Sequence, residues 1–327
     1  MDRDSILEGV AARLNSSEFL AKRTAFQDRF SDQFESVFQE AEGILARLRL
    51  SDRPLPLFVL DNFPLALTSQ LQDLSAAEKG AVAKELVARS LIQLPRFIEQ
   101  AGLPDSIVQC YPTAVGYMTA SIINDNDASY AEGIDSFFDR DLRMASGLTL
   151  PAGAQIVDLR VWLPRTFYRY RGLKKNLRCL SFLAFRLGGL GPLLRIHTDT
   201  RNLLEFNPPG FSDCYCRVAE LLQLMPAVRG MVSTGWFFDP AIEQISPRLQ
   251  YIRRVPLAGG AFVRIDGPDA LDTRHALARS ATRRKLYEEG KYKPICGTMV
   301  WPRKELIRWS EERRRAFSAA TTRPQCV

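Results

Sequence analysis

Two residues suited to proton transfer lie close together in the segment His197-Thr198-Asp199. An imidazole has an ordinary pKa of about 6.5, so it can take a proton from an amine that attacks a carbonyl group. Because side chains at positions i and i+2 of a strand share a face, Asp199 could orient the imidazole or meet a cationic substrate. We therefore expect His197 and Asp199 to be catalytic, with a structural histidine bound to the backbone as the alternative.

Two further segments have the composition of ligand-binding elements. Arg186-Leu187-Gly188-Gly189-Leu190-Gly191 matches R-x-x-G-x-G, in which glycines let the backbone approach a ligand closely; a plain turn before the strand that Pro192 introduces is the alternative. Arg284-Lys285-Leu286-Tyr287-Glu288-Glu289-Gly290 places a tyrosine on an expected helix that ends at glycine. Tyr251, which follows Ser246-Pro247-Arg248-Leu249-Gln250, is a second tyrosine that could serve as a proton donor.

These segments, and the order of elements between them, resemble the GNAT superfamily of N-acetyltransferases. In that family an R-x-x-G-x-G loop binds the pyrophosphate of acetyl-CoA, and the tyrosine of an LYEKxGF segment protonates the departing thiolate. The resemblance therefore implies acyl-CoA as a co-substrate held by Arg186, Gly189 and Gly191, with Tyr287 as the acid. It covers about residues 160–300. The family has a helix directly after the loop, where this sequence has an expected strand.

The second histidine of the chain, His275, opens another hypothesis. The order His197, Asp199, His275 resembles the H-x-D…H triad of the iron(II)/2-oxoglutarate oxygenases, in which two imidazoles and a carboxylate bind one side of a ferrous ion. Those enzymes also bind 2-oxoglutarate through a downstream arginine, and Arg279, Arg283 and Arg284 are available for that role. The triad belongs on a double-stranded β-helix, whereas helices are expected between the two histidines.

The elements that must position these residues change character along the chain. Apolar residues at spacings of three and four predict helices over 5–14 and 18–50, and Ser75 with Glu78 predicts the start of another, which Leu94-Pro95 should interrupt. The second half alternates strands with helices. Strands are expected at 155–162, 193–200, 228–238, 260–266 and 295–301, and helices at 212–224, 239–250, 273–289 and 304–316.

Charge divides the chain at the same place. Residues 1–150 carry 14 Lys and Arg against 22 Asp and Glu, whereas residues 151–327 carry 30 against 15. Together with the glycines and proline of 147–153, this predicts an acidic helical domain at 1–148 and a basic α/β domain at 149–327. The basic part could attract a phosphorylated cofactor or RNA, and residues 167–171 interleave aromatic and basic side chains as single-strand binders do.

Composition excludes several classes of protein. With 46% hydrophobic and 25% charged residues the chain is not disordered, and no apolar stretch long enough for a transmembrane helix occurs. The charged start Met1-Asp2-Arg3-Asp4 and six cysteines without a C-x-x-C pair indicate a cytoplasmic protein with free thiols. No signature of a serine hydrolase, kinase, zincin or simple dehydrogenase is present.

We therefore expect an acyltransferase that moves an acyl group from acyl-CoA or a carrier-bound thioester to a small-molecule or peptide amine. Its expected fold is a helical N-terminal domain followed by a GNAT-like mixed β-sheet domain flanked by helices, without a bound metal. One alternative is the oxygenase, with Fe(II) and 2-oxoglutarate. The other is a non-catalytic protein that binds RNA or an aminoacyl-tRNA, which we favour less.

Overall fold

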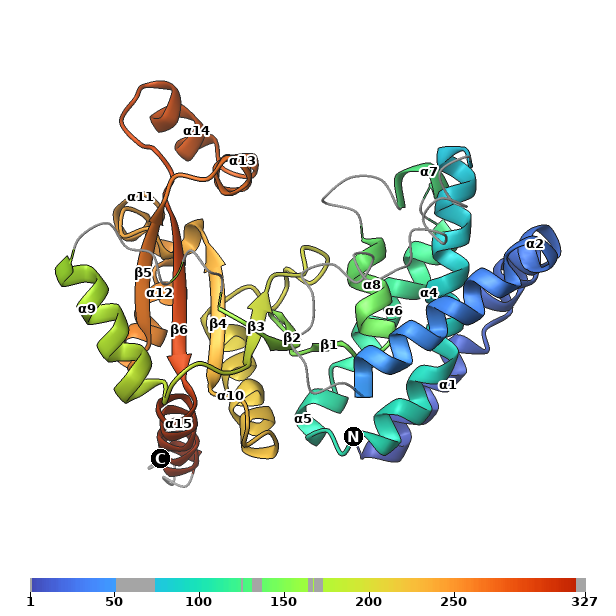
Figure 1. Cartoon of the computed structure of the whole chain (residues 1–327), viewed down its shortest axis with the longest axis horizontal. Coiled ribbons are helices and arrows are strands. Elements are labelled where there is room, and N and C mark those ends of the chain that lie inside the picture. The colour runs from blue at the N-terminus through green and yellow to red at the C-terminus, as the bar shows by residue number, and fades with distance from the viewer. Residues whose placement is uncertain are drawn as a thin grey trace, which may run out of the picture. The chain divides into compact units, whose positions relative to one another are not determined.

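The computed structural model describes residues 2–50, 74–124, 126–130, 137–163, 167 and 173–321. The chain divides into two compact units, Met1–Ala152 with Ile156–Leu159, and Gly153–Gln155 with Arg160–Val327 (Figure 1). The change of unit lies a few residues after the boundary expected at 148/149, and that domain boundary stays a prediction.

Helices make up most of the first unit. They are α1 (Arg3–Leu14), α2 (Ser17–Leu50), α4 (Ala76–Gln100), α5 (Asp105–Val108), α6 (Tyr111–Asn124), α7 (Asp127–Tyr130) and α8 (Phe138–Ala145). The helices predicted over 5–14 and 18–50 are confirmed. Ser75 and Glu78 form the predicted capping box at the start of α4, each side chain binding the other residue's backbone N–H.

Helix α4 continues through Pro95, so the predicted interruption at Leu94-Pro95 is wrong. A proline inside a helix removes one hydrogen bond and costs about 3 kcal/mol. Leu91, Leu94 and Ile98 share one face of this helix and are fully buried. Burying each such side chain stabilises the fold by about 1.5–3 kcal/mol, so their packing outweighs the cost of the proline.

Among the described residues of the first unit, the basic side chains of Lys84 and Arg143 are buried, each beside a partner of opposite charge. Lys84 Nζ lies 2.6 Å from Asp127 Oδ1. Arg143 Nη2 lies 3.2 Å from Asp158 Oδ1, and Arg143 Nε donates a hydrogen bond of 3.1 Å to Thr149 Oγ1. The Arg143 pair therefore fixes α8 to the first two strands of the sheet.

Six strands form a mixed sheet in the order β1-β2-β3-β4-β6-β5. Their bounds are β1 (Thr149–Pro151), β2 (Ile156–Val161), β3 (Leu193–His197), β4 (Gly230–Gly235), β5 (Phe262–Gly267) and β6 (Cys296–Pro302). Strands β3 and β4 are parallel, whereas β4 with β6 and β5 with β6 are antiparallel. The five predicted strands are confirmed, with ends that differ by a few residues.

The second unit surrounds its strands with helices. These are α9 (Leu173–Ser181), the π-helical turn η3 (Phe182–Arg186), α10 (Pro208–Leu224), the 3-10 turns η4 (Trp236–Phe238) and η5 (Pro247–Leu249), α11 (Ile242–Ile245), α12 (Tyr251–Ala258), α13 (Ala270–Ala278), α14 (Ala281–Glu288) and α15 (Arg303–Thr321). The single helix predicted over 273–289 is two helices, because Ser280 accepts a hydrogen bond from the Arg283 N–H and starts α14. Figure 1 shows α13 and α14 beyond the end of β5.

Aromatic packing joins the helices of the second unit to the sheet. Tyr215 of α10 contacts Trp301 of β6 and Trp309 of α15, with ring centroids 5.3 and 6.0 Å apart. Trp301 also donates a hydrogen bond from Nε1 to the backbone oxygen of Gly259, at 3.0 Å. The predicted mixed sheet flanked by helices is thereby confirmed.

Within the described ranges, no helix combines the length and the apolar character needed to cross a membrane. The cysteines in these ranges, Cys110, Cys179, Cys214, Cys216 and Cys296, are free thiols.

We predict that Asp158→Ala lowers the free energy of unfolding by about 3–5 kcal/mol, because it leaves the buried Arg143 guanidinium without its carboxylate. Chemical denaturation followed by circular dichroism measures the change. The control is Glu289→Ala, which removes a carboxylate 2.8 Å from Lys291 Nζ at an exposed site and should cost less than about 1 kcal/mol. Equal losses in the two variants would contradict this account of the buried pair.

Candidate active site

The parallel strands β3 and β4 part before they end. Their backbone pairing stops at Arg195 and Val232, two residues before β3 ends at His197. Strand β4 continues instead with β6, to which it is paired along its whole length. The facing N–H and C=O groups of β3 and β4 are therefore not joined in a ladder beyond Arg195, a feature that we call the β3–β4 divergence.

The loop from Thr198 to Asn207 leads from the end of β3 to the start of α10. Asn207 caps this helix, because its Oδ1 accepts the Gly210 N–H at 2.9 Å and its backbone oxygen accepts the Phe211 N–H at 3.0 Å. A Cβ on Gly210 would lie 2.2 Å from the backbone oxygen of Glu205, so this close approach requires glycine. The positive end of the α10 dipole thus lies in the segment that follows β3.

The start of α10 offers few hydrogen-bond donors to a ligand. Pro208 and Pro209 have no N–H, and the next two N–H groups already bind Asn207. In the loop itself, the N–H groups of Leu203 and Leu204 donate no hydrogen bond to the described part of the chain. An anion at this end of the helix would therefore meet loop amides and the helix dipole.

His197 and Asp199, the predicted catalytic pair, lie at the end of β3 and just after it. His197 is half-buried. Asp199 is buried and accepts hydrogen bonds of 3.0 Å from both the backbone N–H and the Nη2 of Arg201. Asp199 therefore holds the turn that leaves β3, and its action on the His197 imidazole stays a prediction.

Aromatic side chains link the elements around the β3–β4 divergence. Phe206 of the loop lies 5.0 Å from Phe211 of α10 and 5.7 Å from Phe237 of the turn after β4, measured between ring centroids. Phe211 in turn lies 5.2 Å from Tyr251, the first residue of α12. The loop after β3, the turn after β4 and the start of α12 therefore share one apolar cluster.

Tyr251 is the tyrosine of this cluster. Its hydroxyl is buried, and among the described residues it has no hydrogen-bond partner. Burial raises the pKa of Tyr251 to about 12, because the ionised phenolate would lose its solvation. This phenol is therefore protonated at neutral pH and has an unused donor.

A carboxylate network lies at the same end of the sheet, on β5 and β6. Thr298 donates a hydrogen bond of 2.6 Å to Asp266 Oδ2 and lies 3.2 Å from the Thr234 hydroxyl. Arg264 Nε lies 2.9 Å from Asp266 Oδ1. Burial raises the pKa of Asp266 above its ordinary value, and the hydrogen bond from Thr298 and the charge of Arg264 oppose that rise.

The predicted glycine segment lies at the opposite end of the strands, where β3 and β4 begin. It precedes β3, and the Arg229 N–H before β4 donates to the backbone oxygen of Pro192. Arg186 Nε donates to Glu305 Oε1 at 2.9 Å, and its Nη2 donates to the backbone oxygen of Gly260. The structure does not bring Arg186, Gly189 and Gly191 to His197, because the segment lies where β3 begins and His197 lies where β3 ends. This placement argues against the pyrophosphate role expected for them.

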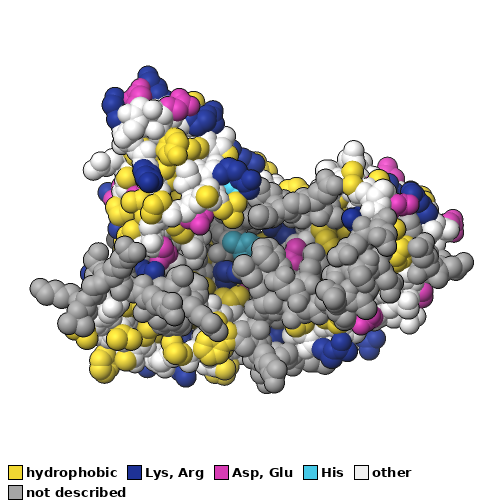
Figure 2. All heavy atoms as spheres, turned by 45° about the horizontal axis from the view of Figure 1, so that its top comes forward, with side chains coloured by type: hydrophobic (Ala, Val, Ile, Leu, Met, Phe, Trp, Pro, Cys, Tyr) yellow, Lys and Arg dark blue, Asp and Glu magenta, His cyan; other side chains and the backbone are white. Residues whose placement is uncertain are grey.

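Tyr287, the acid expected from the sequence, is 42% exposed on α14. Helices α13 and α14 and the turn after them carry exposed basic side chains, namely Arg274, Arg279, Arg284, Lys285, Lys291 and Lys293. Figure 2 shows Lys and Arg side chains on this part of the second unit. Tyr287 thus belongs to a charged outer segment, in contrast with the buried phenol of Tyr251.

The proposed iron triad is not assembled. Among the described residues, no group of three His, Cys, Asp or Glu side chains could hold a metal ion. His197 ends β3, whereas His275 is exposed on α13. The oxygenase hypothesis required both imidazoles and Asp199 on one side of a β-helix, and the mixed sheet with helices does not provide that arrangement.

Nothing in the sequence singles out Asp266 or the buried hydroxyl of Tyr251. Asp266 ends an expected strand, a position where parallel sheets commonly bind ligands, but the sequence does not show which strands are neighbours. Tyr251 follows a Pro-containing turn and begins a helix, a signal too common to single it out. Of the aromatic and basic segment 167–171, only Phe167 is among the described residues.

No protein-family model matches the sequence, and the comparison with curated proteins found no match. Several solved structures are similar to the chain. An acyltransferase in complex with decanoyl-CoA aligns with a TM-score of 0.50 over 92% of this chain and 100% of that chain, at 13% identity. An acyltransferase in complex with CoA and 10C-teicoplanin aligns with a TM-score of 0.50 over 89% and 85%, at 14% identity.

At these identities the similarity is one of fold. It confirms the predicted GNAT-like acyltransferase fold, in which a mostly helical N-terminal region precedes a mixed sheet with flanking helices. Because the alignment covers 92% of the chain, the similarity includes most of both units, whereas the resemblance in the sequence was confined to the second. The chain therefore has the fold of a GNAT-like acyltransferase.

Proposed function

We propose that this chain transfers an acyl group from acyl-CoA to an amine. The observation that carries the proposal is the β3–β4 divergence, in a chain whose fold is similar to that of an acyltransferase with decanoyl-CoA bound. Strand edges without a partner can hydrogen-bond an extended chain that contains amides, and the pantetheine arm of CoA is such a chain. The aromatic cluster of Phe206, Phe211 and Phe237 supports an apolar acyl group nearby.

We place the phosphates of the donor against the loop from Thr198 to Asn207 rather than against the Arg186–Gly191 segment. The loop lies at the same end of the strands as the β3–β4 divergence. The positive end of the α10 dipole and the backbone amides of Leu203 and Leu204 lie there. Arg186, in contrast, donates a hydrogen bond to Glu305 at the other end of the strands.

The reaction needs one base and one acid. The amine nitrogen attacks the thioester carbon, the new N–C bond forms, and the C–S bond breaks. We assign the amine proton to His197, directly or through a water molecule, and the thiolate takes a proton from the Tyr251 hydroxyl. Asp266 supports the acceptor step, because a carboxylate at this end of the sheet attracts the ammonium form of an amine.

The RNA-handling hypothesis rests on the net charge of the second part and on the segment 167–171, of which only Phe167 is among the described residues, and we do not carry it further. The identity of the amine acceptor stays open between a small molecule and a peptide.

We expect CoA and decanoyl-CoA to bind the full chain with one site and micromolar affinity in isothermal titration calorimetry. Arg186→Gln should change the Kd for CoA less than about twofold, because Arg186 is bound to Glu305 and makes no contact with the phosphates in this proposal. If Arg186 did bind a phosphate, its loss would weaken CoA binding about tenfold or more. Absence of binding at millimolar CoA would overturn the proposed function. A large loss in Arg186→Gln alone would return the phosphate site to the glycine segment.

Tyr251→Phe should lower kcat about 10²-fold with decanoyl-CoA and an amine, while the Kd for CoA stays unchanged, since general acid catalysis contributes about that much. The release of thiol from decanoyl-CoA measures the rate. Tyr287→Phe makes the same chemical change on the exposed helix α14 and should leave kcat within about twofold. If Tyr287→Phe is the slow variant instead, the acid is Tyr287, as the sequence suggested.

The raised pKa of Tyr251 has a measurable consequence for stability. A tyrosine in the unfolded chain ionises near its ordinary pKa of 10, whereas folded Tyr251 holds its proton to about 12. The stability that the neutral phenol contributes is therefore complete below pH 10 and is lost as the pH rises from 10 toward 12. Between pH 9 and about 11, wild type should lose more free energy of unfolding than Tyr251→Phe. Identical losses would show that the phenol is not buried as described.

A further inference from the structure

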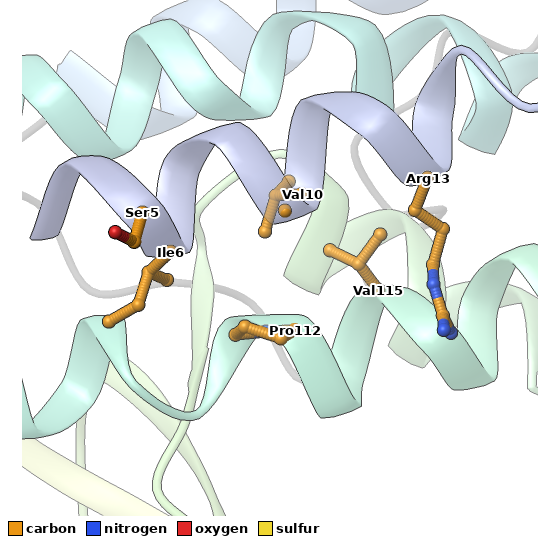
Figure 3. A pocket seen from close by; sticks show the side chains of 7 residues that line it. Ser5, Ile6, Val10, Arg13, Pro112 and Val115 are labelled. Atoms are coloured by element: carbon orange, nitrogen blue, oxygen red, sulfur yellow. The ribbon is translucent and has the colours of Figure 1, made fainter. Parts of the chain in front are cut away.

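One helix of the second unit exposes large apolar side chains, whereas most of the described chain buries them. The small cavity between α1 and α6 illustrates the usual case (Figure 3). Its apolar walls Ile6, Val10 and Val115 are at most 2% exposed, so it offers a ligand almost no apolar surface. The exposed apolar side chains of the second unit are therefore the feature that calls for a partner.

Helix α9, the π-helical turn η3 and the glycine segment 186–191 carry four large apolar side chains that are more than half exposed. Phe185 is 85% exposed, and Leu177, Leu180 and Leu190 are 56%, 55% and 57% exposed. Figure 1 shows α9 on the outer side of the second unit. We call these four side chains the outer apolar face. Single exposed leucines are ordinary, but several gathered in one segment mark a surface that is covered in use.

The same segment buries its other side. Cys179, Phe182 and Leu183 belong to an apolar cluster with Val232 of β4 and Val300 of β6. This packing holds α9 and η3 on the sheet without using the outer apolar face. A helix that is apolar on both sides is typical of one that is covered on both.

The π-helical turn brings the exposed side chains closer together. Leu177 and Leu180, three residues apart, lie on one side of α9. In η3 the Leu187 N–H donates to the Phe182 backbone oxygen, five residues before it, so one turn takes more residues than in an α-helix. Phe185, five residues after Leu180, therefore lies nearer to the side of Leu180 than it would in an α-helix.

The charge around this face has one sign. Residues 159–198 contain nine Lys and Arg and no Asp or Glu. Arg178 is exposed on α9, and Arg229 is exposed beside the glycine segment. The carboxylate that approaches from α15 is Glu305, which accepts a hydrogen bond of 2.9 Å from Arg186 Nε. The outer apolar face therefore lies in a segment suited to an anionic surface.

We propose that the outer apolar face inserts shallowly into the surface of a lipid bilayer that contains anionic phospholipids. The Leu and Phe side chains enter the boundary between headgroups and acyl chains, and Lys and Arg of the same segment meet the lipid phosphates. Long basic side chains can lie along apolar surface while their charged ends reach the headgroups. The inference goes beyond the proposed acyl transfer and does not depend on it.

The kind of exposed side chain favours lipid over other anionic partners. Bases of RNA stack on aromatic rings or guanidinium planes, and three of the four exposed side chains are leucines, which have no such plane. A folded protein would need a pocket shaped for Phe185, which projects from η3. A fluid bilayer receives a projecting side chain without a preformed pocket. Leucines, a projecting phenylalanine and charge of one sign together indicate a lipid surface.

Cosedimentation of the full chain with vesicles, in buffer without CoA, tests the proposal. Wild type should bind vesicles of mixed phosphatidylcholine and phosphatidylglycerol at least about tenfold more tightly than vesicles of phosphatidylcholine alone. Phe185→Ser and Leu180→Ser should each weaken this binding about tenfold without a lower Tm, because each removes an exposed side chain that the bilayer would bury. Leu20→Ser makes the same change at an exposed position of α2 and should bind as wild type does.

Three results would overturn the proposal: no binding of wild type to the mixed vesicles at millimolar lipid, equal binding to the two kinds of vesicle, or unchanged vesicle binding by Phe185→Ser. Self-association or binding of single-stranded RNA that Phe185→Ser abolishes, with vesicle binding unchanged, would assign the face to a second copy of the chain or to RNA instead. Failure of the chain to bind CoA leaves the vesicle experiment valid, because no acyl donor is present in it.

Discussion

The partnership of β4 with β6 is the constraint on which the candidate site depends. All six residues of β4 pair with β6 in an antiparallel ladder, whereas its parallel pairing with β3 includes two positions. Antiparallel hydrogen bonds are slightly more stable per residue than parallel ones, so β4 follows β6 and leaves β3 as the sheet twists. The divergence therefore comes from the sheet itself and needs no ligand to create it.

A parallel pair also dictates what surrounds that divergence. Two parallel strands cannot be joined by a hairpin, so the chain must return from the end of β3 to the start of β4 through a helix. The connection from β3 to β4 begins with a loop and the positive end of α10, at the end of the strands where β3 and β4 separate. Gly210 permits the tight entry, and Asn207 satisfies the first amides. Binding groups gather there because of the topology.

The sequence predicted where the helices and strands lie along the chain better than it predicted which of them are adjacent in the fold. Alternation and helical spacing located five of the six strands and the longest helices α1, α2, α4, α10 and α15, since those patterns are local, whereas β1 and the helices α6, α8, α9 and α12 were not expected. The error at Pro95 arose because buried Leu91, Leu94 and Ile98 stabilise a helix that local preference would end. The glycine segment at Arg186 matched a short pattern, but its position depends on which end of β3 it joins. Nor could the sequence show that the Tyr251 hydroxyl is buried and Tyr287 exposed, because burial depends on packing between distant segments.

Burial is what separates the two tyrosines chemically. An amine is a nucleophile in its neutral form, which becomes more abundant as the pH rises toward the ordinary pKa of a lysine, about 10.4. The acid that serves the leaving thiolate must still hold its proton at that pH, and a phenol with a pKa of about 12 does so. The base must meanwhile be unprotonated, which an imidazole achieves at a much lower pH. In the proposed reaction, opposed environments for acid and base would allow both to act at one pH, and burial of the Tyr251 hydroxyl supplies the environment that the acid requires.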